Sequence, residues 1–537
     1  MKSYDAGQTH TPLLEETIGA NFERVVAANA DAEALVDVAQ DRRWTYGALN
    51  AEINQVARAL VALGINSGDR IGIWAPNCAE WTIVQYATAK IGAILVTINP
   101  AYRRHELAYV LNQSGVRTLI AVTMYKTSDY RCMIEQVRPQ CHTLDHVIFL
   151  DTDDWATLRS LSELVSMNDL HARSASLSNS DPINIQYTSG TTGFPKGATL
   201  SHRNIVNNGF FVAELLNLGP NDRLCIPVPF YHCFGMVLGN LGATTHGATM
   251  VIPAPRFDPG ATLATIEAER CTAVYGVPTM FIAMLGHPEF ARRDLSSLRT
   301  GIMAGSICPV EVMKRCVAEM NMSEVAIAYG MTETSPVSCQ TLLDDDLERR
   351  TASVGRAHPH VEIKIVEPET GEIVERGQTG EFCTRGYSVM AGYWRDEAAT
   401  REAIDADGWM HSGDLAVMRD DGYCTVVGRL KDMVIRGGEN IYPREIEEFL
   451  ITHPDIDDAH VIGVPDARHG EEVCVWIRMK PGRVALDADT LRAFATGKLS
   501  HYKIPRYVHI VDEFPMTVTG KVRKVDMREQ SIRLLGL

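Results

Sequence analysis

The chain has 537 residues, of which 45% are apolar and 22% are charged, a composition typical of a globular protein with a sizeable buried core. Acidic residues outnumber basic ones by 67 to 51, so the formal net charge is −16. This balance argues against a protein that binds nucleic acid through its overall field, and a polyanionic ligand would need local basic residues instead.

The twelve cysteines are scattered, with no CxxC pair and no spacing typical of zinc ligands. We therefore expect reduced, mostly buried thiols in a cytoplasmic protein. Residues 1–24 include several acidic side chains and no apolar stretch, so no secretory or transit peptide is expected. Residues 224–255 carry no formal charge, but their four prolines and four glycines favour buried core or pocket lining over a transmembrane segment.

Helical and strand patterns alternate through the first part of the chain. Apolar residues at helical spacing predict a helix over residues 49–63 that stops at Gly64, and a short buried strand follows over 71–75. Asn77 with Glu80 three residues later indicates a capped helix start.

That second helix is expected to run to Ile91 and to lead into a strand over 93–98. A strand, a helix and a strand at this spacing predict an α/β fold with a parallel sheet, because parallel strands need crossover connections. Three further apolar runs continue the pattern, at residues 118–122, 248–252 and 273–277.

The pattern changes near residue 361, where short alternating segments are separated by glycine-rich turns. We expect one brief helix there, over 396–404, within a small, β-barrel-like antiparallel unit that closes a large, multi-layer α/β domain over residues 1–428. After Gly428 the pattern becomes mixed, and residues 429–537 hold 17 basic and 17 acidic side chains, so the whole net charge lies upstream. A smaller α+β domain is therefore expected over 429–537.

The strongest local motif is YTSGTTGFPKG at residues 187–197. Glycines and small hydroxyl residues in series let backbone N–H groups and hydroxyls wrap a polyphosphate, and Lys196 adds a cation. The motif is not a Walker A loop, because Pro195 stands five residues after Gly190. The residues alone leave open both phosphate binding and an ordinary surface loop.

With five further motifs, the chain resembles the adenylate-forming superfamily of acyl-CoA synthetases, 4-coumarate:CoA ligases, luciferases and peptide-synthetase adenylation domains. These motifs follow in the family's order across nearly the whole chain: PFYHCFG at 229–235, YGMTET at 329–334, HSGDL at 411–415, GRLKDMVIRGGENIYPREIE at 428–447 and PMTVTGK at 515–521. Six motifs in one order make chance agreement negligible. The overall sequence pattern is most similar to that of medium-chain fatty acid:CoA ligases.

The resemblance implies an ATP-binding site. The loop would hold the β and γ phosphates through Thr188, Ser189, Gly190, Thr191, Thr192 and Lys196. Thr332 would contact the α-phosphate, and Glu333 would bind Mg²⁺, a hard cation that prefers carboxylate and phosphate oxygens. Without the neighbouring motif, Glu333 would be read as an ordinary helix-start carboxylate.

The resemblance also implies contacts to the nucleoside. Tyr329 would lie against the adenine with Gly305 and Ser306 beside it, although a lone tyrosine is more often ordinary core. Asp414 would accept both ribose hydroxyls through its two oxygens. Arg429 would support Asp414 from the domain junction.

Two half-reactions follow from the resemblance. A carboxylate attacks the α-phosphorus of ATP and expels pyrophosphate, which needs charge neutralisation and alignment rather than a protein nucleophile. Lys521 would reach the α-phosphate and the attacking carboxylate in this step. The small domain would then swivel about Lys431, and His232 would close the acyl pocket before thioester formation.

Coenzyme A would approach a glycine turn in the second half-reaction, since adjacent glycines allow close backbone contact with a pantetheine arm. The residues of that turn are Gly437, Gly438 and Glu439. Basic residues near the C-terminus are candidates for contacts to the phosphates of coenzyme A, although a charge run is usually a solvated surface: Lys498, Lys503, Arg506, Arg523 and Lys524.

The acyl pocket is expected to be apolar and open. Amino-acid-activating relatives carry an Asp in the segment equivalent to PFYHCFG, where only His232 is polar enough here, which argues against an amino acid substrate. Acetate-activating relatives carry a pocket-blocking Trp where this chain has Gly330. The expected walls, which suit a fatty acid, are Phe234, Met236, Val277, Met303, Met331 and Val337.

Several alternatives stay open. An aryl acid is the second candidate substrate, and an acyl-AMP ligase that loads a carrier protein is a second class of function. A catalytically inactive binding protein and a light-emitting oxygenase share the motifs but are less favoured. The expected partners are small molecules, namely a fatty acid, ATP and CoA, with no nucleic acid and no transmembrane segment, and a homodimer stays open.

Overall fold

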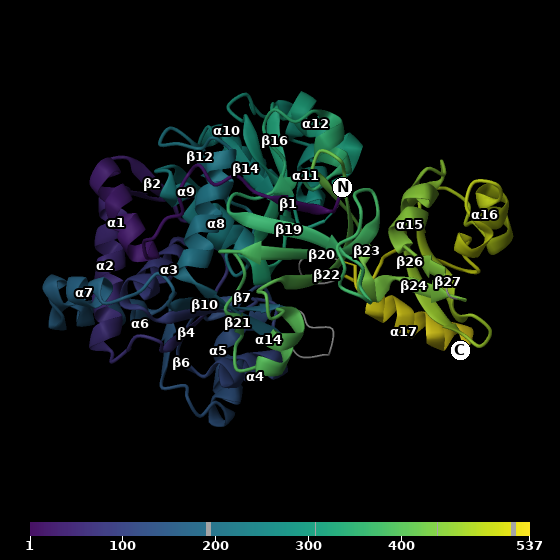
Figure 1. The fold of residues 1–537 in the computed structure, drawn as a ribbon. Helices are drawn as coiled ribbons and strands as arrows, with labels where there is room; N and C mark the ends of the chain where they lie inside the picture. The colour runs from purple at the N-terminus through teal and green to yellow at the C-terminus, as the bar shows by residue number, and fades with distance from the viewer. Residues whose placement is uncertain (189–194, 307, 438, 517–521) are drawn as a thin grey trace. The chain divides into compact units, whose positions relative to one another are not determined.

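The structure is a computed structural model that describes residues 1–188, 195–306, 308–437, 439–516 and 522–537 (Figure 1). Two compact units divide the chain. The larger unit comprises Asp5–Ile363 and Thr384–His411, and the smaller comprises Met1–Tyr4, Lys364–Cys383 and Ser412–Leu537. The boundary expected at residue 429 lies inside the smaller unit and stays a prediction about domain movement.

A nine-stranded sheet forms one half of the larger unit. Its central strands, from β16 to β2, run parallel, and its edges pair antiparallel. The strand order is β18 (Arg356–Ala357), β17 (Val337–Gln340), β16 (Glu324–Gly330), β15 (Thr300–Ala304), β14 (Ala273–Gly276), β12 (Arg223–Cys225), β13 (Thr249–Ile252), β2 (Glu33–Asp37) and β3 (Arg42–Thr45).

A seven-stranded sheet forms the other half, and it confirms the expected parallel pairing of the strands near residues 71–75 and 93–98. Its order is β21 (Gly392–Tyr393), β11 (Lys196–Ser201), β10 (Pro182–Thr188), β5 (Ile94–Thr97), β4 (Arg70–Trp74), β6 (Val116–Ala121) and β9 (His146–Phe149). A separate two-stranded ribbon joins β7 (Met124–Tyr125) to β8 (Ser128–Asp129).

Helices fill the space between the sheets and cover their outer faces (Figure 1). The shared central core takes side chains from α1 (Ile18–Asn29), α2 (Tyr46–Ala62), α3 (Ala79–Ile91) and α8 (His202–Leu215). The nine-stranded sheet packs outward on α10 (Pro259–Ala268), α11 (Pro278–Leu285) and α12 (Val310–Glu319). The seven-stranded sheet packs outward on α4 (Arg104–Ser114) and α5 (Tyr130–Val137).

Strand alternation explains these layers. In β5, Leu95 joins the central core, whereas Val96 joins the outer core with α4 and α5. Both faces are buried because side chains of a strand alternate between the two faces, and each face meets helices. The remaining helices of this unit are α6 (Asp153–Ser160), α7 (Met167–Ala175), α9 (Gly242–Thr245), α13 (Leu347–Ala352) and α14 (Glu397–Ala403), with short 3₁₀ turns η1 (Val38–Gln40), η2 (Arg138–Gln140), η3 (Leu161–Leu164), η5 (Phe290–Arg292) and η6 (Thr332–Thr334).

The uncharged segment at residues 224–255 is buried core, as expected. It forms β12, a π-helix η4 (Phe234–Leu241), α9 and β13, and all eight residues of η4 are buried. No helix in the part of the chain that the structure describes is long and apolar enough to cross a membrane.

The expected small β unit is present as a five-stranded sheet. Its order is β1 (Tyr4–Ala6), β19 (Val361–Val366), β20 (Thr379–Gly386), β22 (Met410–Met418) and β23 (Cys424–Arg429). The 3₁₀ turn η7 (Leu430–Asp432) follows β23.

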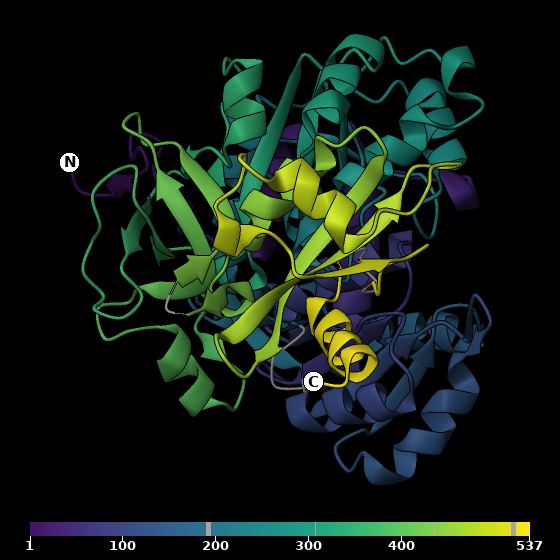
Figure 2. The ribbon, with the colours of Figure 1, turned by 90° about the vertical axis from the view of Figure 1, so that its right-hand side faces the viewer.

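The C-terminal part of the smaller unit is an α+β sandwich with its own core. Its sheet contains β25 (Glu439–Ile441), β24 (Val434–Arg436), β27 (Gly470–Met479) and β26 (Ile456–Asp466), with β28 (Tyr507–Ile510) paired to β27. It also contains α15 (Pro443–Ile451), α16 (Ala488–Ala495), η8 (His501–Lys503) and α17 (Lys524–Leu535), the yellow helix near the C-terminus in Figure 2. The indole of Trp476 donates a hydrogen bond to Ser531 Oγ at 2.8 Å, which fixes α17 on this sheet.

The capping box expected at Asn77 and Glu80 is wrong. Helix α3 begins at Ala79, and its first amide donates instead to Asp37 Oδ2 at 3.0 Å. Glu80 forms a two-pronged ion pair with Arg42, with N–O distances of 2.6 and 2.9 Å. Tertiary partners therefore replace the local cap that the sequence suggested.

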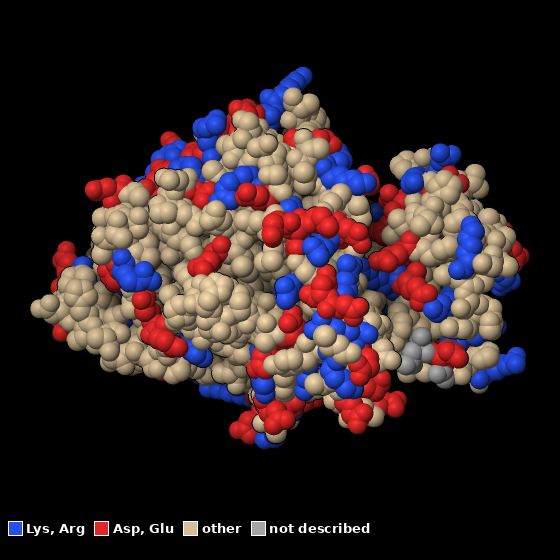
Figure 3. All heavy atoms as spheres, turned by 45° about the horizontal axis from the view of Figure 1, so that its top comes forward, with Lys and Arg blue, Asp and Glu red and all other residues tan. Residues whose placement is uncertain are grey.

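Surface charge is mixed (Figure 3), and the thiols are mostly buried, as expected for the thiols. Acidic and basic side chains are interspersed over the face shown in Figure 3. Eleven of the twelve cysteines are buried free thiols, and Cys132 on α5 is exposed. Burial raises the pKa of the Cys316 thiol to about 12, as expected for an inert core cysteine.

Two histidines are buried as neutral imidazoles in the larger unit. Burial lowers the pKa of His358 to about 3 and that of His202 to about 4. An unfolded histidine has a pKa of about 6.5. Below that pH these two histidines are therefore protonated in the unfolded chain but still neutral in the folded chain. Their contribution to stability is present above about pH 6.5 and is lost as the pH falls toward the folded values.

We expect the free energy of unfolding to fall between about pH 7.5 and about pH 5, by about 2 kcal/mol for each of these two histidines. His358→Gln should reduce the difference by about that amount, measured by urea unfolding at both pH values. His10→Gln, at an exposed position, is the matched control and should leave the difference unchanged. An equal pH difference in the wild type and His358→Gln would contradict this account.

Candidate functional site

Three elements of the larger unit meet at the carboxylate of Glu333. Glu333 lies in η6 and is buried, with 8% of its surface exposed. Tyr393, from β21, donates its hydroxyl to Glu333 Oε1 at 2.9 Å, and Thr188, at the end of β10, donates to the same oxygen at 3.3 Å. The structure thus brings together Thr188 and Glu333, two of the residues that the sequence predicts to act on ATP.

Tyr393 is a site residue that sequence reasoning missed, because a tyrosine in a short GYW run carries no signal of its own. Burial, and after it the charge of Glu333, raise the pKa of Tyr393, so its hydroxyl stays a donor. The ammonium of Lys196 lies 5.1 Å from the ring centroid of Tyr393, within range of a cation–π contact.

The β10–β11 hairpin holds both ends of the predicted phosphate loop. Thr188 is paired with Lys196 in the antiparallel register, so the two ends of the loop are fixed opposite each other. Four predicted phosphate ligands lie in residues 189–194, outside the described residues: Ser189, Gly190, Thr191 and Thr192.

The predicted nucleoside residues of the larger unit lie at the carboxyl ends of two neighbouring strands. In the parallel register of β15 and β16, Ala304 pairs with Ala328, so Gly305 and Tyr329 follow side by side. Gly305 has φ +89°, and a Cβ there would lie 3.1 Å from Val277 Cγ1. Ser306 follows Gly305 in the chain, and Thr332 stands three residues after Tyr329. The roles of these residues stay predictions.

The segment that carries His232 contacts strand β10. The amide of Phe234 donates to His232 Nδ1 at 3.2 Å, so a neutral imidazole carries its proton on Nε2. Cys233 donates its thiol to Gln186 Oε1 on β10 at 3.1 Å. Burial, and then the charge of Glu333, raise the pKa of Cys233.

Five of the six expected pocket walls belong to the central core. Phe234, Met236 and Val337 are buried there, with Val277 and Met331 packed against them. Met303 does not belong with them: it joins the outer core under α12, with Cys308 Sγ 3.0 Å from its sulfur. Met303 was expected on the wrong face because side chains of β15 alternate, and Ile302 is the one that faces inward.

Gly330 is required by its turn. A Cβ at this position would lie 1.8 Å from the carbonyl oxygen of Pro336, so no side chain fits without a backbone shift. The absence of a blocking tryptophan at 330 therefore reflects the path of the 330–336 turn and is not a measure of pocket depth.

The smaller unit pairs Asp414 with Arg429. Asp414 and Arg429 are paired in the register of β22 and β23, and Arg429 Nε lies 3.2 Å from Asp414 Oδ1. Asp414 is buried with 9% exposure, whereas Arg429 is exposed. Partial desolvation, and then the charge of Arg429, lower the pKa of Lys431 at the expected hinge.

The predicted glycine turn joins β24 to β25. Gly437 has φ +60°, and its amide donates to the carbonyl of His469 at 2.8 Å. Arg436, before the turn, forms an ion pair with the buried Glu472, and Glu439 after it is exposed. Gly438 and Lys521 lie outside the described residues.

The five basic candidates for contacts to coenzyme A are mostly engaged elsewhere. Their partners are carboxylates of the same unit: Lys503 with Glu445 at 2.6 Å, Arg506 with Asp466 at 3.0 Å, Arg523 with Asp526 at 3.1 Å and Lys524 with Glu447 at 2.6 Å. Lys498 lies 4.2 Å from the ring centroid of Phe494. These contacts favour the interpretation as a solvated surface, because phosphate binding would have to open existing pairs.

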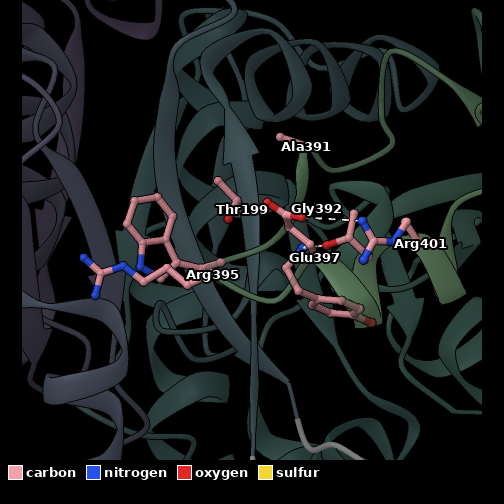
Figure 4. Close-up of a pocket in the computed structure, with 9 residues that line it drawn as sticks. Thr199, Ala391, Gly392, Arg395, Glu397 and Arg401 are labelled. Carbon is pink, nitrogen blue, oxygen red and sulfur yellow. Dashed lines mark hydrogen bonds and ion pairs between the residues drawn. The ribbon is translucent and has the colours of Figure 1, made fainter.

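A cavity of about 340 Å³ lies between β21 and α14 (Figure 4). Tyr393 is in its wall and links it to Glu333. Arg395 and Arg401 lie on opposite sides, with Arg401 directed toward Glu397 at 3.4 Å. No sequence motif indicated this cavity. Its remaining lining residues are Thr199, Ala391, Gly392, Trp394 and Thr400.

Comparison with known families establishes the class. Residues 22–394 match the family of AMP-binding enzymes, and residues 445–521 match the C-terminal domain of AMP-binding enzymes. The chain belongs to the AMP-binding enzyme family, as its six motifs indicated.

Relatives match along nearly their whole length. YngI of Bacillus subtilis (strain 168), whose name places it among the acyl-CoA synthetases, is 48% identical, covering 98% of this chain and 99% of that protein. The mitochondrial medium-chain acyl-CoA ligase ACSF2 is 44% identical in Danio rerio and 41% in Homo sapiens, each covering 100% of this chain and 91% of the relative.

Solved structures agree with the fold. The anthranilate CoA ligase AuaEII in complex with anthranoyl-AMP has a TM-score of 0.85 at 27% identity, covering 98% of this chain and 99% of that chain. ATP-bound MatB from Rhodopseudomonas palustris has a TM-score of 0.84 at 28% identity, covering 96% and 99%. The fold class expected from the sequence, a large α/β part with a smaller C-terminal part, is confirmed.

Glu333 and its neighbours fit a bound Mg²⁺, because carboxylate and hydroxyl oxygens are the ligands that this ion prefers. The two described hydrogen bonds to Glu333 come from neutral hydroxyls. They orient the carboxylate and bring no positive charge to it.

Tyr393→Phe should weaken ATP binding in the presence of Mg²⁺ by about 10- to 150-fold, because a hydrogen bond to a charged group is worth roughly 1.5–3 kcal/mol. Isothermal titration calorimetry with and without Mg²⁺ measures the effect. Tyr46→Phe is the matched control, since its buried hydroxyl donates to the carbonyl of Ala248 at 2.7 Å, away from Glu333. Equal ATP affinity in wild type and Tyr393→Phe would show that Tyr393 does not orient the site.

Proposed function

We propose that the protein is an ATP-dependent fatty acid:CoA ligase that forms acyl-CoA, AMP and pyrophosphate through an acyl-adenylate. One observation carries the proposal: strand β10 of the hairpin that frames the phosphate loop contacts both the Glu333 carboxylate, through Thr188, and the His232 segment, through Gln186. Full-length relatives named as acyl-CoA ligases support it.

The first half-reaction needs charge neutralisation around the phosphates of ATP. Thr188 and Lys196 stand at the two ends of the loop, and the loop amides and hydroxyls between them would bind the β and γ phosphates. Mg²⁺, held by Glu333, would supply further positive charge at the phosphates. The fatty acid carboxylate attacks the α-phosphorus, the bond to pyrophosphate breaks, and Thr332 and Lys521 would stabilise the charge on the α-phosphate.

The second half-reaction transfers the acyl group to sulfur. The thiol of coenzyme A attacks the acyl carbonyl, and the bond to AMP breaks. The turn at Gly437 would admit the pantetheine arm, because glycine allows close backbone approach. We propose that the smaller domain swivels near Lys431 between the two steps, so that Lys521 serves the first step and the glycine turn the second.

The remaining predicted contacts are to the nucleoside. Tyr329, Gly305 and Ser306 would form the adenine site, and Asp414 would accept the ribose hydroxyls. Arg429, which is paired with Asp414 at 3.2 Å, would keep that carboxylate oriented.

The acid is proposed to be a fatty acid of medium to longer chain. The apolar walls that include Phe234, Met236 and Val337 suit an aliphatic tail, and the ACSF2 relatives are named for medium-chain substrates. An aryl acid is the second candidate, because a close structural neighbour binds anthranoyl-AMP. The scattered, reduced cysteines fit a cytoplasmic role in fatty acid metabolism.

A panel of linear acids from short to long chain, with coumarate and Mg-ATP, tests the proposal. We expect thioester and AMP in the presence of coenzyme A, with a maximum at medium or longer chains, measured by mass spectrometry. Adenylate and pyrophosphate without thioester would instead favour an acyl-AMP ligase that loads a carrier protein. A maximum for coumarate would favour an aryl-acid ligase.

Lys521→Ala should slow adenylate formation by roughly 100- to 1,000-fold, because a preorganised donor to developing charge is worth about 3–4 kcal/mol. It should spare thioester formation from supplied acyl-adenylate, measured separately in a single-turnover assay. Lys314→Ala, at an exposed lysine of α12 that pairs with Glu311, is the control for charge removal. Loss of both half-reactions in Lys521→Ala would contradict the assigned role.

A further inference from the structure

Helix α3 presents a polar edge to the segment that carries His232, inside an otherwise apolar core. Thr82, Gln85 and Tyr86 lie on this edge at helical spacing, and all three are buried. The facing segment contains η4 and α9, whose residues belong largely to the same apolar cluster. We call the contact between this polar edge and η4 with α9 the polar seam. Buried polar groups in an apolar core cost stability unless they are hydrogen-bonded.

Gln85 bridges two points of η4. Its side-chain Nε2 donates to the carbonyl oxygen of Met236 at 3.0 Å, and its Oε1 accepts from Asn240 Nδ2 at 2.8 Å. Gln85 is 3% exposed and Asn240 is fully buried. The nitrogen and the oxygen of the Gln85 amide therefore both hold η4, at Met236 and at Asn240.

Contacts on either side of Gln85 hold the flanking parts of the segment. Asn77, just before α3, donates to the carbonyl of Val228 at 2.9 Å and accepts from the amide of Phe230 at 2.9 Å. Tyr86 and Thr244 share a hydrogen bond of 2.5 Å on the far side. Helix α3 and the residue Asn77 just before it therefore anchor the segment before His232, within η4 and after it.

The seam is not the arrangement that would maximise stability. Asn240 Oδ1 is buried and has no hydrogen-bond partner among the described residues. An unpaired buried acceptor is a cost that two apolar side chains would avoid. Fully paired polar contacts specify one arrangement of a core, and π-helical turns such as η4 occur frequently at functional sites.

The path of η4 matters because it begins beside β10, the strand that carries Thr188 of the proposed ATP site. Cys233 precedes η4 and contacts Gln186, next to the strand end that carries Thr188. Phe234 in its first turn stacks on Tyr275, with 5.8 Å between ring centroids. A small rotation or shift of η4 would change which of its side chains face an acyl tail that extends from that site.

We propose that Gln85 is a positioning residue for acyl-chain specificity, which holds η4 in the one register that gives the pocket its depth. The inference rests on the proposed function, since it concerns the acid that this site activates. Gln85 itself touches neither ATP nor the reacting carboxylate. Its effect passes through the Met236 carbonyl and Asn240.

The test measures acid-dependent pyrophosphate release for linear acids from short to long chain, without coenzyme A, so that it does not depend on the identity of the acceptor. We expect Gln85→Met, which keeps the length of the side chain but cannot bridge, to reduce discrimination between the preferred acid and its neighbours by about tenfold. One methylene in an apolar pocket is commonly worth about 10- to 200-fold. The KM for ATP should stay unchanged.

Two further variants separate positioning from stability. Gln85→Met with Asn240→Leu also removes the amide that Gln85→Met leaves unpaired, so the melting temperature should recover toward that of the wild type, although the Met236 carbonyl stays unpaired. The altered chain-length profile should stay. Gln55→Leu on α2 is the control, since the Gln55 amide bonds Arg159 at 2.7 and 3.0 Å away from η4. It should keep the wild-type profile.

An unchanged chain-length profile in Gln85→Met and in the double variant would overturn the inference, whatever happens to the melting temperature. A profile that recovers together with stability in the double variant would also overturn it, because the role would then be structural. If the wild type releases pyrophosphate with no acid, the proposed function fails first, and the inference fails with it. Pyrophosphate release without thioester formation would correct only the acceptor.

Discussion

The pairing of β10 with β11 is the constraint on which the rest of the site depends. The hairpin fixes the two ends of the phosphate loop opposite each other, through the register of Thr188 and Lys196. Because β21 adds to the outer edge of β11, the hairpin also carries Tyr393 to the carboxylate of Glu333. Loop, carboxylate and orienting hydroxyl are thus set by one run of backbone hydrogen bonds.

The two units treat their key carboxylates differently. Glu333 is buried and its described hydrogen bonds come from hydroxyls, so its negative charge stays available to a cation. Asp414 is equally buried but is paired with the exposed guanidinium of Arg429. A carboxylate paired in this way is oriented as an acceptor, which suits hydroxyl groups better than a metal ion.

Periodicity predicted the elements, and motifs predicted the site, but contacts between distant segments lay beyond both. The helix over 49–63 and the brief helix over 396–404 were predicted correctly, since each has a local pattern and a local end. The cap at Asn77 was wrong because its amide is used by Val228 and Phe230, which are distant in sequence. Met303 was placed on the wrong face because a buried strand is apolar on both sides. Tyr393 could not be found, since only the sheet edge brings it to Glu333.

The buried cysteines can report on local unfolding of the folded protein. A thiol-specific reagent meets Cys132 at once, whereas the other eleven cysteines are shielded and belong to several different layers of the core. Each buried thiol becomes reactive only when its own layer opens, because both access and the ionised form are withheld in the native state. The order in which they react would therefore rank the layers by local stability, with no probe added to the chain.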